Sequence, residues 1–194
     1  PLFFIYDAMA VPTEFLSTWN ELAIKNGLDG ICFIGRIKDD NEFDEIIKKG
    51  FSFVTSERIN GIAKHRNLFI RRLFQVKNIL LKKPVNYYSY KEAYPFFINK
   101  EVDSKSNFIP SIIPNWDHSP RSQSRGIILH NSTPELFRKH IKEVFELIKN
   151  KPQDEQIVFL KSWNEWGEGN YMEPDLKWGK QYIEALKAEL SSRN

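Results

Sequence analysis

The sequence predicts an α/β fold built around a parallel β-sheet. Short apolar runs alternate along the chain with longer stretches in which apolar residues recur at helical spacing. Strands that alternate with helices in this way are typical of βαβ units, and they argue against a β-sandwich. The 194 residues suffice for one sizeable core, so we expect a single domain over residues 1–194.

The first elements follow from the apolar runs. Leu2–Tyr6 is predicted to be a buried strand, and a helix is expected from Pro12 to about Asn26, where Asn26-Gly27 supplies a stop. The apolar face of that helix comprises Phe15, Trp19, Leu22 and Ala23. The next predicted elements are a strand over Gly30–Ile34, a short helix over Asn41–Lys48 and a weaker apolar run over Phe51–Thr55.

The second half continues the alternation. One long basic helix is predicted from Asn60 to Lys83, with Leu68, Phe69, Leu73, Val76, Ile79 and Leu80 on one stripe. Thr133-Pro134 favours a helix start, because Thr133 can cap and Pro134 suits the first turn. Strands are expected at Val85–Tyr90, Asn107–Ile113 and Ile157–Trp163, and a last helix at Gly179–Leu190. This gives five or six βα units, fewer than the eight of a closed (β/α) barrel.

The composition is that of an ordinary globular protein. Hydrophobic residues make up 41% and charged residues 27%, and 28 Lys and Arg against 25 Asp and Glu give a net charge of +3. This weak charge does not indicate a nucleic-acid partner, and no apolar run has the length of a membrane span. The single Cys32 lies in an apolar run, which favours a buried thiol in a reducing compartment. We therefore expect a cytoplasmic location.

The densest group of reactive side chains follows the last predicted strand. The segment Ser162-Trp163-Asn164-Glu165-Trp166-Gly167-Glu168-Gly169 brings two glutamates and two indoles to the carboxyl end of a strand, where parallel α/β folds bind ligands. The glycines allow a sharp turn, so that Glu165 and Glu168 can face one cavity. The alternative is a structural loop with helix-capping glutamates and core tryptophans.

Paired carboxylates beside indole rings fit the chemistry of glycosidic bonds. One carboxylic acid protonates the leaving oxygen while the other carboxylate takes up a proton or attacks. Aromatic rings stack on sugar faces, and 14% of this chain is aromatic. We therefore predict that Glu165 and Glu168 form a catalytic acid/base pair.

This segment resembles the C-terminal signature of the WbsX proteins. Glu173-Pro174-Asp175 and the helix that contains Tyr182-Ile183-Glu184-Ala185 continue the match. A second block, Pro114-Asn115-Trp116-Asp117-His118-Ser119-Pro120-Arg121, is similar to the same family's Trp-Asp-Asn-Thr-Pro-Arg segment, with His118 in place of Asn. Pro1–Tyr6 is similar to an earlier strand of these proteins.

The resemblance implies a fold and an activity. WbsX proteins are described as bacterial glycosyltransferases of O-antigen and capsule synthesis, and their barrel looks like that of family 99 endo-α-mannosidases. By this resemblance the chain is the C-terminal portion of a (β/α)8 barrel, a fragment without the N-terminal half. Glu165 would be the general base that assists the sugar's own 2-hydroxyl, and Glu168 the general acid. Substrate contacts are expected from Asn164, Trp166, Trp116, Asp117, Arg121, Glu173 and Tyr6.

Several of these residues have a second interpretation. Asp117 and Arg121 either bind sugar hydroxyls or pair with each other to brace a turn, and Trp116 is either a stacking platform or a core ring. The four histidines show no metal-ligand spacing, and no glycine-rich phosphate loop is present, so no metal or cofactor is expected.

The predicted basic helix also has two interpretations. It is either a solvated outer face or a contact with an anionic partner, namely a lipid-diphosphate-linked substrate or the membrane surface. Its basic residues are Lys64, His65, Arg66, Arg71, Arg72, Lys77, Lys82 and Lys83.

Three hypotheses about function follow. The first is a glycosyltransferase that acts on an oligosaccharide or polysaccharide, and the second is an endo-α-mannosidase-like hydrolase with the same acid pair. The third is a carbohydrate-binding fragment without catalysis, which the missing barrel half favours.

Overall fold

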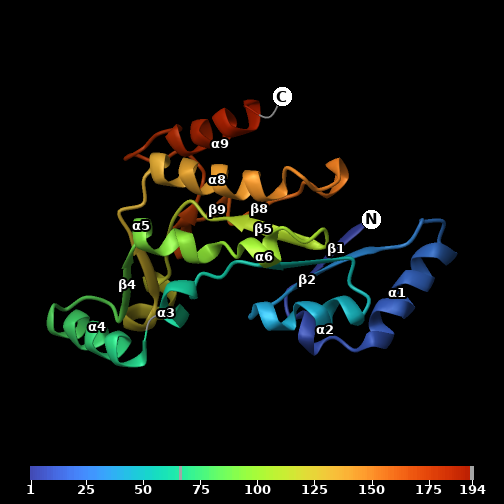
Figure 1. Ribbon diagram of the computed structural model, residues 1–194, viewed down its shortest axis with the longest axis horizontal. Helices are drawn as coiled ribbons and strands as arrows, with labels where there is room; N and C mark the ends of the chain where they lie inside the picture. Colours follow the sequence, from blue (N-terminus) through green and yellow to red (C-terminus); the bar gives the residue numbers. More distant parts are fainter. Residues whose placement is uncertain (66, 193–194) are drawn as a thin grey trace. The chain divides into compact units, whose positions relative to one another are not determined.

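The computed structural model describes residues 1–65 and 67–192, and these form two compact units (Figure 1). The first unit consists of Pro1–Ser56, Lys100–Pro110 and Ile148–Val158. The second consists of Glu57–Asn99, Ser111–Leu147 and the chain from Phe159 onward. The single domain over residues 1–194 remains a prediction.

The first unit is a parallel sheet with helices between its strands. Its strands are β1 (Leu2–Ile5), β2 (Cys32–Arg36), β3 (Phe53–Ser56) and the first part of β5 (Phe108–Ile112), paired in that order. Its helices are η1 (Ala8–Ala10), α1 (Thr13–Lys25), η2 (Asp40–Glu42), α2 (Phe43–Lys48), α6 (Lys100–Asp103) and η5 (Gln153–Glu155). The register aligns Ile34 with Phe53 and Val54 with Phe108, so the central strands are apolar on both faces, as expected of a parallel sheet.

The core of this unit requires a glycine in β2. A Cβ atom at Gly35 would lie 2.8 Å from the Phe51 ring and 2.9 Å from the Ala8 methyl group. Ile46 and Val54 are completely buried in the same cluster. Because Gly35 has no side chain, β2 can pack closely against the residues that cover it.

The second unit contains the remaining elements. Its helices are α3 (Gly61–His65), α4 (Leu68–Leu80), α5 (Tyr90–Ala93), η3 (Tyr94–Phe97), α7 (Ser119–Ser122), η4 (Gln123–Arg125), most of α8 (Pro134–Ile148), η6 (Trp166–Glu168) and α9 (Gln181–Ser191). Its strands are β4 (Asn86–Ser89), β6 (Trp116–Asp117), β7 (Ile127–His130), β8 (Phe159–Leu160), β9 (Asn164–Glu165) and β10 (Asn170–Tyr171).

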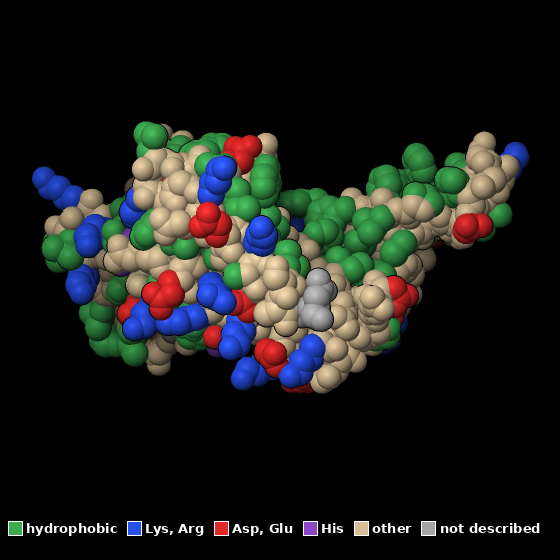
Figure 2. Space-filling view, turned by 90° about the horizontal axis from the view of Figure 1, so that it is seen from above, with side chains coloured by type: hydrophobic (Ala, Val, Ile, Leu, Met, Phe, Trp, Pro, Cys, Tyr) green, Lys and Arg blue, Asp and Glu red, His purple; other side chains and the backbone are tan. Residues whose placement is uncertain are grey.

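These strands form four pairings, one of which is the antiparallel pair β9 and β10. The last residues of β5 pair in parallel with β8, β4 pairs in parallel with β7, and β6 pairs antiparallel with β7. Helices α8 and α9 lie side by side in Figure 1, and Arg138 on α8 donates to Glu189 on α9 at 2.5 Å. Figure 2 shows one face of the molecule, on which acidic and basic side chains are intermixed.

Most predicted elements are present, but several differ from the prediction. Leu2–Tyr6 is not buried: β1 has one neighbouring strand among the described residues, and Leu2 is 57% exposed. Cys32 is half-buried. The predicted last strand is reduced to Phe159–Leu160. The short strands β6, β7, β9 and β10 were not predicted, because two- to four-residue strands carry little periodicity.

The predicted long basic helix is divided into α3 and α4. Asn67 ends the continuity, since its side-chain oxygen accepts from the Phe69 N–H at 2.9 Å and caps α4. Arg66 lies outside the described residues. The predicted cap of α8 is confirmed: the Thr133 hydroxyl oxygen accepts from the Leu136 N–H at 3.2 Å.

One buried group makes stability depend on pH. His140 on α8 is completely buried, and the Tyr90 hydroxyl oxygen lies 3.3 Å from its Nδ1 atom. Burial lowers the pKa of His140 to about 3. In the unfolded chain a histidine titrates near 6.5, so below that pH the unfolded state gains a proton that the folded state does not bind. Stability contributed by neutral His140 is therefore complete above about pH 6.5 and is lost as the pH falls toward 3.

We predict that His140→Phe, which keeps a ring in this aromatic site, flattens the acid side of the stability profile. The wild-type protein should lose about 1.4 kcal/mol per pH unit more than the variant between roughly pH 6 and 4. Urea unfolding at a series of pH values measures this difference. Parallel pH profiles for the two proteins would contradict the assignment.

Candidate active site

A β-hairpin at the carboxyl end of β8 carries both predicted glutamates. Strand β9 ends with Glu165, the 3-10 turn η6 ends with Glu168, and β10 returns antiparallel with Asn170 opposite Glu165. The turn therefore brings the two carboxylates to the same end of the hairpin, as the glycines of this segment predicted.

Two asparagine amides, one of them completely buried, hold this hairpin on the ends of β5 and β8. The side chain of Asn170 is completely buried and donates to the backbone oxygens of Asn115 (2.6 Å) and Lys161 (2.9 Å). Asn115 in turn accepts from the Tyr171 N–H at 2.8 Å and donates to the Tyr171 oxygen at 3.1 Å. These two side chains bind backbone atoms. They therefore fix the position of the whole hairpin, and not only that of one side chain.

Arg121 on α7 joins the two glutamates. Its guanidinium Nη1 lies 2.6 Å from Glu168 Oε1, and its Nη2 lies 3.9 Å from Glu165 Oε1. His118 Nε2 lies 3.4 Å from the same Glu168 oxygen. The guanidinium offsets the repulsion between two neighbouring carboxylates and orients both toward one point.

The two carboxylates differ in their access to water. The side chain of Glu168 is 12% exposed, whereas that of Glu165 is 45% exposed. A carboxylate as buried as Glu168 requires a hydrogen-bonded partner, and Arg121 supplies it. The site therefore offers one sheltered and one solvated carboxyl group.

Asp117 supports this arrangement from β6. Its Oδ1 accepts from the Ser119 N–H at 2.9 Å and from the Ser119 hydroxyl at 2.5 Å, at the start of the short helix that carries Arg121. Asp117 also lies against Gly169: a Cβ atom added at Gly169 would be only 2.7 Å from the Cβ atom of Asp117. Gly169 has a φ of +50° and follows Glu168 directly. Asp117 thus contacts both segments that form the site.

An aromatic surface lies beside the carboxylates. The Trp166 ring stacks on Tyr171 with centroids 3.7 Å apart and planes 13° from parallel, and Trp166 Nε1 donates to Glu173 at 2.6 Å. Trp166 is 47% exposed, so its fixed ring presents an open face. Such a face is suited to stacking on a sugar ring.

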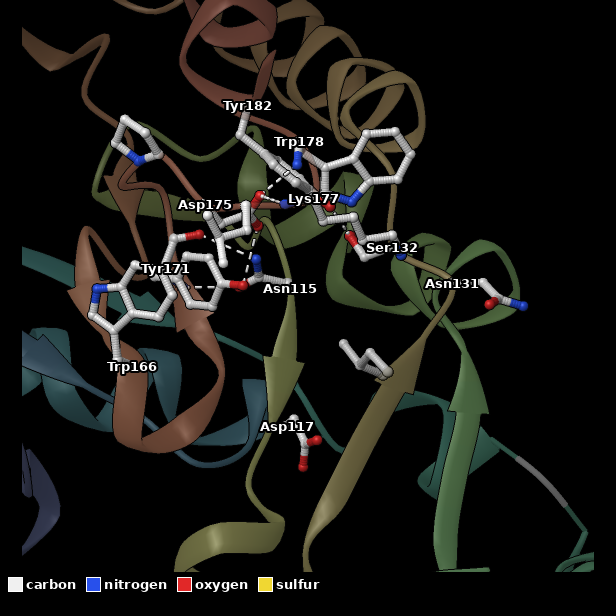
Figure 3. Close-up of a pocket in the computed structure, with 13 residues that line it drawn as sticks. Asn115, Asp117, Asn131, Ser132, Trp166, Tyr171, Asp175, Lys177, Trp178 and Tyr182 are labelled. Carbon is white, nitrogen blue, oxygen red and sulfur yellow. Dashed lines mark hydrogen bonds between the residues drawn. The ribbon is translucent and has the colours of Figure 1, made fainter. Parts of the chain in front are cut away.

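A cavity of about 750 Å³ opens next to the acid pair (Figure 3). Asp117 and Trp166 belong both to this cavity and to the segments that carry the glutamates, whereas Glu165 and Glu168 do not line it. Its lining consists of Asn115, Asp117, Leu129, Asn131, Ser132, Trp166, Tyr171, Pro174, Asp175, Leu176, Lys177, Trp178 and Tyr182. This volume accommodates a small oligosaccharide-sized ligand.

Hydrogen-bonding groups converge on one wall of the cavity. Tyr171 donates to Asp175 at 3.1 Å, and the hydroxyl groups of Tyr182 and Ser132 lie 2.7 Å apart. Burial raises the pKa of Tyr182 to about 12 and also raises the pKa of Tyr171, whose hydroxyl bonds to the Asp175 carboxylate. Both phenols therefore stay neutral and can donate at neutral pH.

The structure brings most of the predicted site residues together. Glu165, Glu168, Asp117 and Arg121 form one cluster, and Asn164 (exposed), Trp166 and Glu173 belong to the same hairpin segment. The alternative pairing of Asp117 with Arg121 is not the observed one, since Arg121 binds the glutamates.

Two further predicted contacts have partners of their own. The Trp116 ring is only 8% exposed and belongs to the core of the second unit, with the Lys161 ammonium 5.3 Å from its centroid, which favours the core interpretation. Tyr6 belongs to the first unit, where its ring lies 4.3 Å from the Arg36 guanidinium carbon. Their roles in substrate binding remain predictions.

Sequence reasoning did not find Ser132 and Tyr182 as partners. They are 50 positions apart, and no local pattern links a residue before one helix to a residue in the next. In the described part of the chain, no three His, Cys, Asp or Glu side chains are grouped as metal ligands would be. Within the same residues, no helix has both the length and the apolar character that crossing a bilayer requires.

The family model described as Glycosyltransferase WbsX matches residues 1–186, which is nearly the whole chain. The chain belongs to the WbsX family. The resemblance inferred from the two motifs is thereby confirmed. The description of this model names the family as one of glycosyltransferases.

Two solved structures share the fold of this WbsX member. The endo-alpha-mannosidase of glycoside hydrolase family 99 from Bacteroides thetaiotaomicron aligns with a TM-score of 0.56 and 18% identity, over 99% of this chain and 54% of that one. Its complex with bis-tris-propane gives a TM-score of 0.56 and 16% identity, over 100% of this chain and 58% of that one. The α/β fold with a parallel sheet is therefore similar to that of these enzymes.

Two curated relatives match part of the WbsX chain. The uncharacterized proteins WxcX from Xanthomonas campestris pv. campestris strains B100 and ATCC 33913 are each 32% identical over 83 residues. The match covers 42% of this chain and 12% of each relative. The chain thus spans about half the length of the solved neighbours and a small share of the curated relatives.

Gly169 offers a test of how the site is built. We predict that Gly169→Ala destabilises the protein by about 1–3 kcal/mol more than Gly179→Ala, because its Cβ would overlap the Asp117 backbone and side chain. Gly179 is the matched control: its φ is +54°, but nothing lies within 4 Å of an added Cβ. Urea unfolding of both variants measures the difference. Equal losses would show that the close approach of Asp117 to Gly169 is not required.

Proposed function

We propose that this chain carries the acid/base pair of a glycosyltransferase that acts in bacterial cell-surface polysaccharide synthesis. The observation that carries the proposal is the contact of one guanidinium, Arg121, with both Glu165 and Glu168. The Trp166 ring and the adjacent cavity support the proposal, because a sugar bound there would lie beside both glutamates.

The roles of the two glutamates follow the family pattern. Glu168, which is sheltered, protonates the leaving oxygen, and Glu165, which is more exposed, accepts the proton of the attacking hydroxyl group as a general base. In the family 99 pattern that hydroxyl is the sugar's own 2-hydroxyl. Arg121 must exchange its bond to Glu168 for a substrate oxygen when the acid receives its proton.

The proposed partners are an oligosaccharide or polysaccharide, with a lipid-diphosphate-linked substrate as the specific form, and the proposed location is the cytoplasm. We also propose that the chain is the C-terminal portion of a (β/α)8 barrel with five or six βα units, completed by an N-terminal half. Activity assays therefore belong on the protein as the cell makes it.

Hydrolysis is the second candidate, because the solved fold neighbours are endo-alpha-mannosidases. It differs from transfer in one respect, namely that water takes the place of the acceptor sugar. Mass spectrometry of products from α-mannosyl oligosaccharides, with and without an added acceptor sugar, separates the two. Acceptor-containing products support transfer, whereas acceptor-independent shortening of the substrate supports hydrolysis.

We predict that Glu168→Gln lowers the turnover rate by about 10²- to 10⁴-fold, because the amide cannot supply a proton. Sugar binding should change far less, since glutamine retains the shape of the side chain, and the unfolding midpoint should fall only by the loss of the ion pair with Arg121. Glu184→Gln on α9 is the matched control and should keep full activity. Turnover is measured as product released from the substrates above.

Retained turnover in Glu168→Gln would contradict the acid assignment. Sugar binding without turnover in the wild-type protein at any pH would instead support a carbohydrate-binding protein without catalysis.

A further inference from the structure

Helix α4 presents its apolar side to solvent. Its largest side chains are among the most exposed of the described chain, with Leu68 79%, Leu80 77% and Phe69 70% exposed. The apolar residues exposed in and directly after this helix are Leu68, Phe69, Ile70, Leu73, Val76, Ile79, Leu80 and Leu81. A solvated outer face, which was one interpretation of this basic helix, would be polar, so these residues require another explanation.

The orientation of α4 is fixed by contacts on its opposite side. Asn78 is the buried residue of the helix, and its side chain donates to the Val85 backbone oxygen at 3.3 Å. Phe74 stacks on Tyr88 of β4 with ring centroids 5.5 Å apart and planes nearly parallel. In Figure 1, α4 accordingly lies beside β4. The apolar face points outward because the opposite face of α4 packs on the rest of the second unit.

Cations flank this apolar face. Phe69, Leu73, Val76 and Leu80 follow one another at helical spacing and share the outer face, while Arg72 and Lys77 project from its two sides. Both cations are exposed, and neither forms an ion pair within residues 1–65 and 67–192. An apolar stripe between two cations is the pattern of helices that lie in a membrane interface, where long basic side chains reach the headgroups.

The surrounding sequence is uniformly basic. Residues 58–91 contain nine Lys and Arg and no Asp or Glu. A second copy of this face would oppose Arg72 and Lys77 with like charges, whereas an anionic lipid headgroup neutralises them. Charge complementarity thus selects a lipid surface over self-association.

We propose that α4 is a peripheral membrane-binding helix that docks on an anionic lipid bilayer. Its 13 residues give a length of about 20 Å, too short to span the hydrocarbon core, so the helix lies parallel to the surface. Phe69, Leu73 and Leu80 enter the acyl-chain boundary, and Arg72 and Lys77 bind the headgroups.

Membrane docking would also orient the candidate active site. Helix α4 packs on β4, β4 pairs with β7, and β7 pairs with β6, which carries Asp117. The small sheet β4-β7-β6 therefore connects the lipid-facing helix to the residue that supports the acid pair. The inference does not depend on the reaction that the site performs.

The test is flotation of the protein, as the cell makes it, with lipid vesicles. We expect at least about tenfold tighter binding to vesicles of phosphatidylcholine and phosphatidylglycerol at a 3:1 ratio than to phosphatidylcholine alone, with weakening as salt rises. Phe69→Ser/Leu73→Ser/Leu80→Ser should abolish binding. Arg72→Glu/Lys77→Glu should weaken it about tenfold or more, since each cation near the surface contributes roughly fivefold.

Matched variants control for general changes of polarity and charge. Leu190→Ser replaces an exposed leucine on α9, and Lys142→Glu/Lys187→Glu reverses two exposed cations on α8 and α9. These variants should bind vesicles as the wild-type protein does. All α4 positions chosen are exposed, so the unfolding midpoints should be unchanged, which urea unfolding checks.

Three results would overturn the proposal. The first is absence of binding to phosphatidylglycerol vesicles, as expected if another part of the protein covers α4. The second is equal loss of binding in the α9 and α8 controls. The third is a dimer in sedimentation velocity that the α4 variants dissociate, which would make this face a contact between two copies.

Discussion

The ion pair between Arg121 and Glu168 is the interaction on which the candidate site depends. It joins a single helical turn after β6 to the hairpin after β8, two segments that are 47 positions apart. Without a cation at this point, a largely buried carboxylate would be unpaired next to a second one, an arrangement that proteins avoid. The site is thus assembled by charge, on a hairpin that asparagine amides hold in place.

The fold determines where this pairing can occur. β5 and β8 run in parallel, and the backbone atoms just beyond them, at Asn115 and Lys161, receive the Asn170 amide that anchors the hairpin. Gly169 then allows the chain to pass against Asp117. The carboxyl ends of parallel strands meet at one edge, which is why ligand sites of such folds gather there.

Much of this arrangement could be predicted from the sequence, and the remainder could not for physical reasons. The parallel α/β pattern follows from periodicity, and the sharp turn between Glu165 and Glu168 follows from glycine placement, whereas the hairpin strands β9 and β10 are too short to predict. The partner of Arg121 could not be assigned, because Asp117 is close in sequence and Glu168 is close only in space. The apolar stripe of α4 was predicted, but its exposure was not, since periodicity identifies a face and not what covers it.

A double-mutant cycle tests the central claim most directly. Urea unfolding of the wild-type protein, Arg121→Met, Glu168→Gln and the double variant gives the coupling free energy between the two side chains. A paired guanidinium and sheltered carboxylate predict a favourable coupling of about 1 kcal/mol or more, reduced at high salt. A coupling near zero would mean that Arg121 does not hold Glu168, and the account of the site would then be wrong.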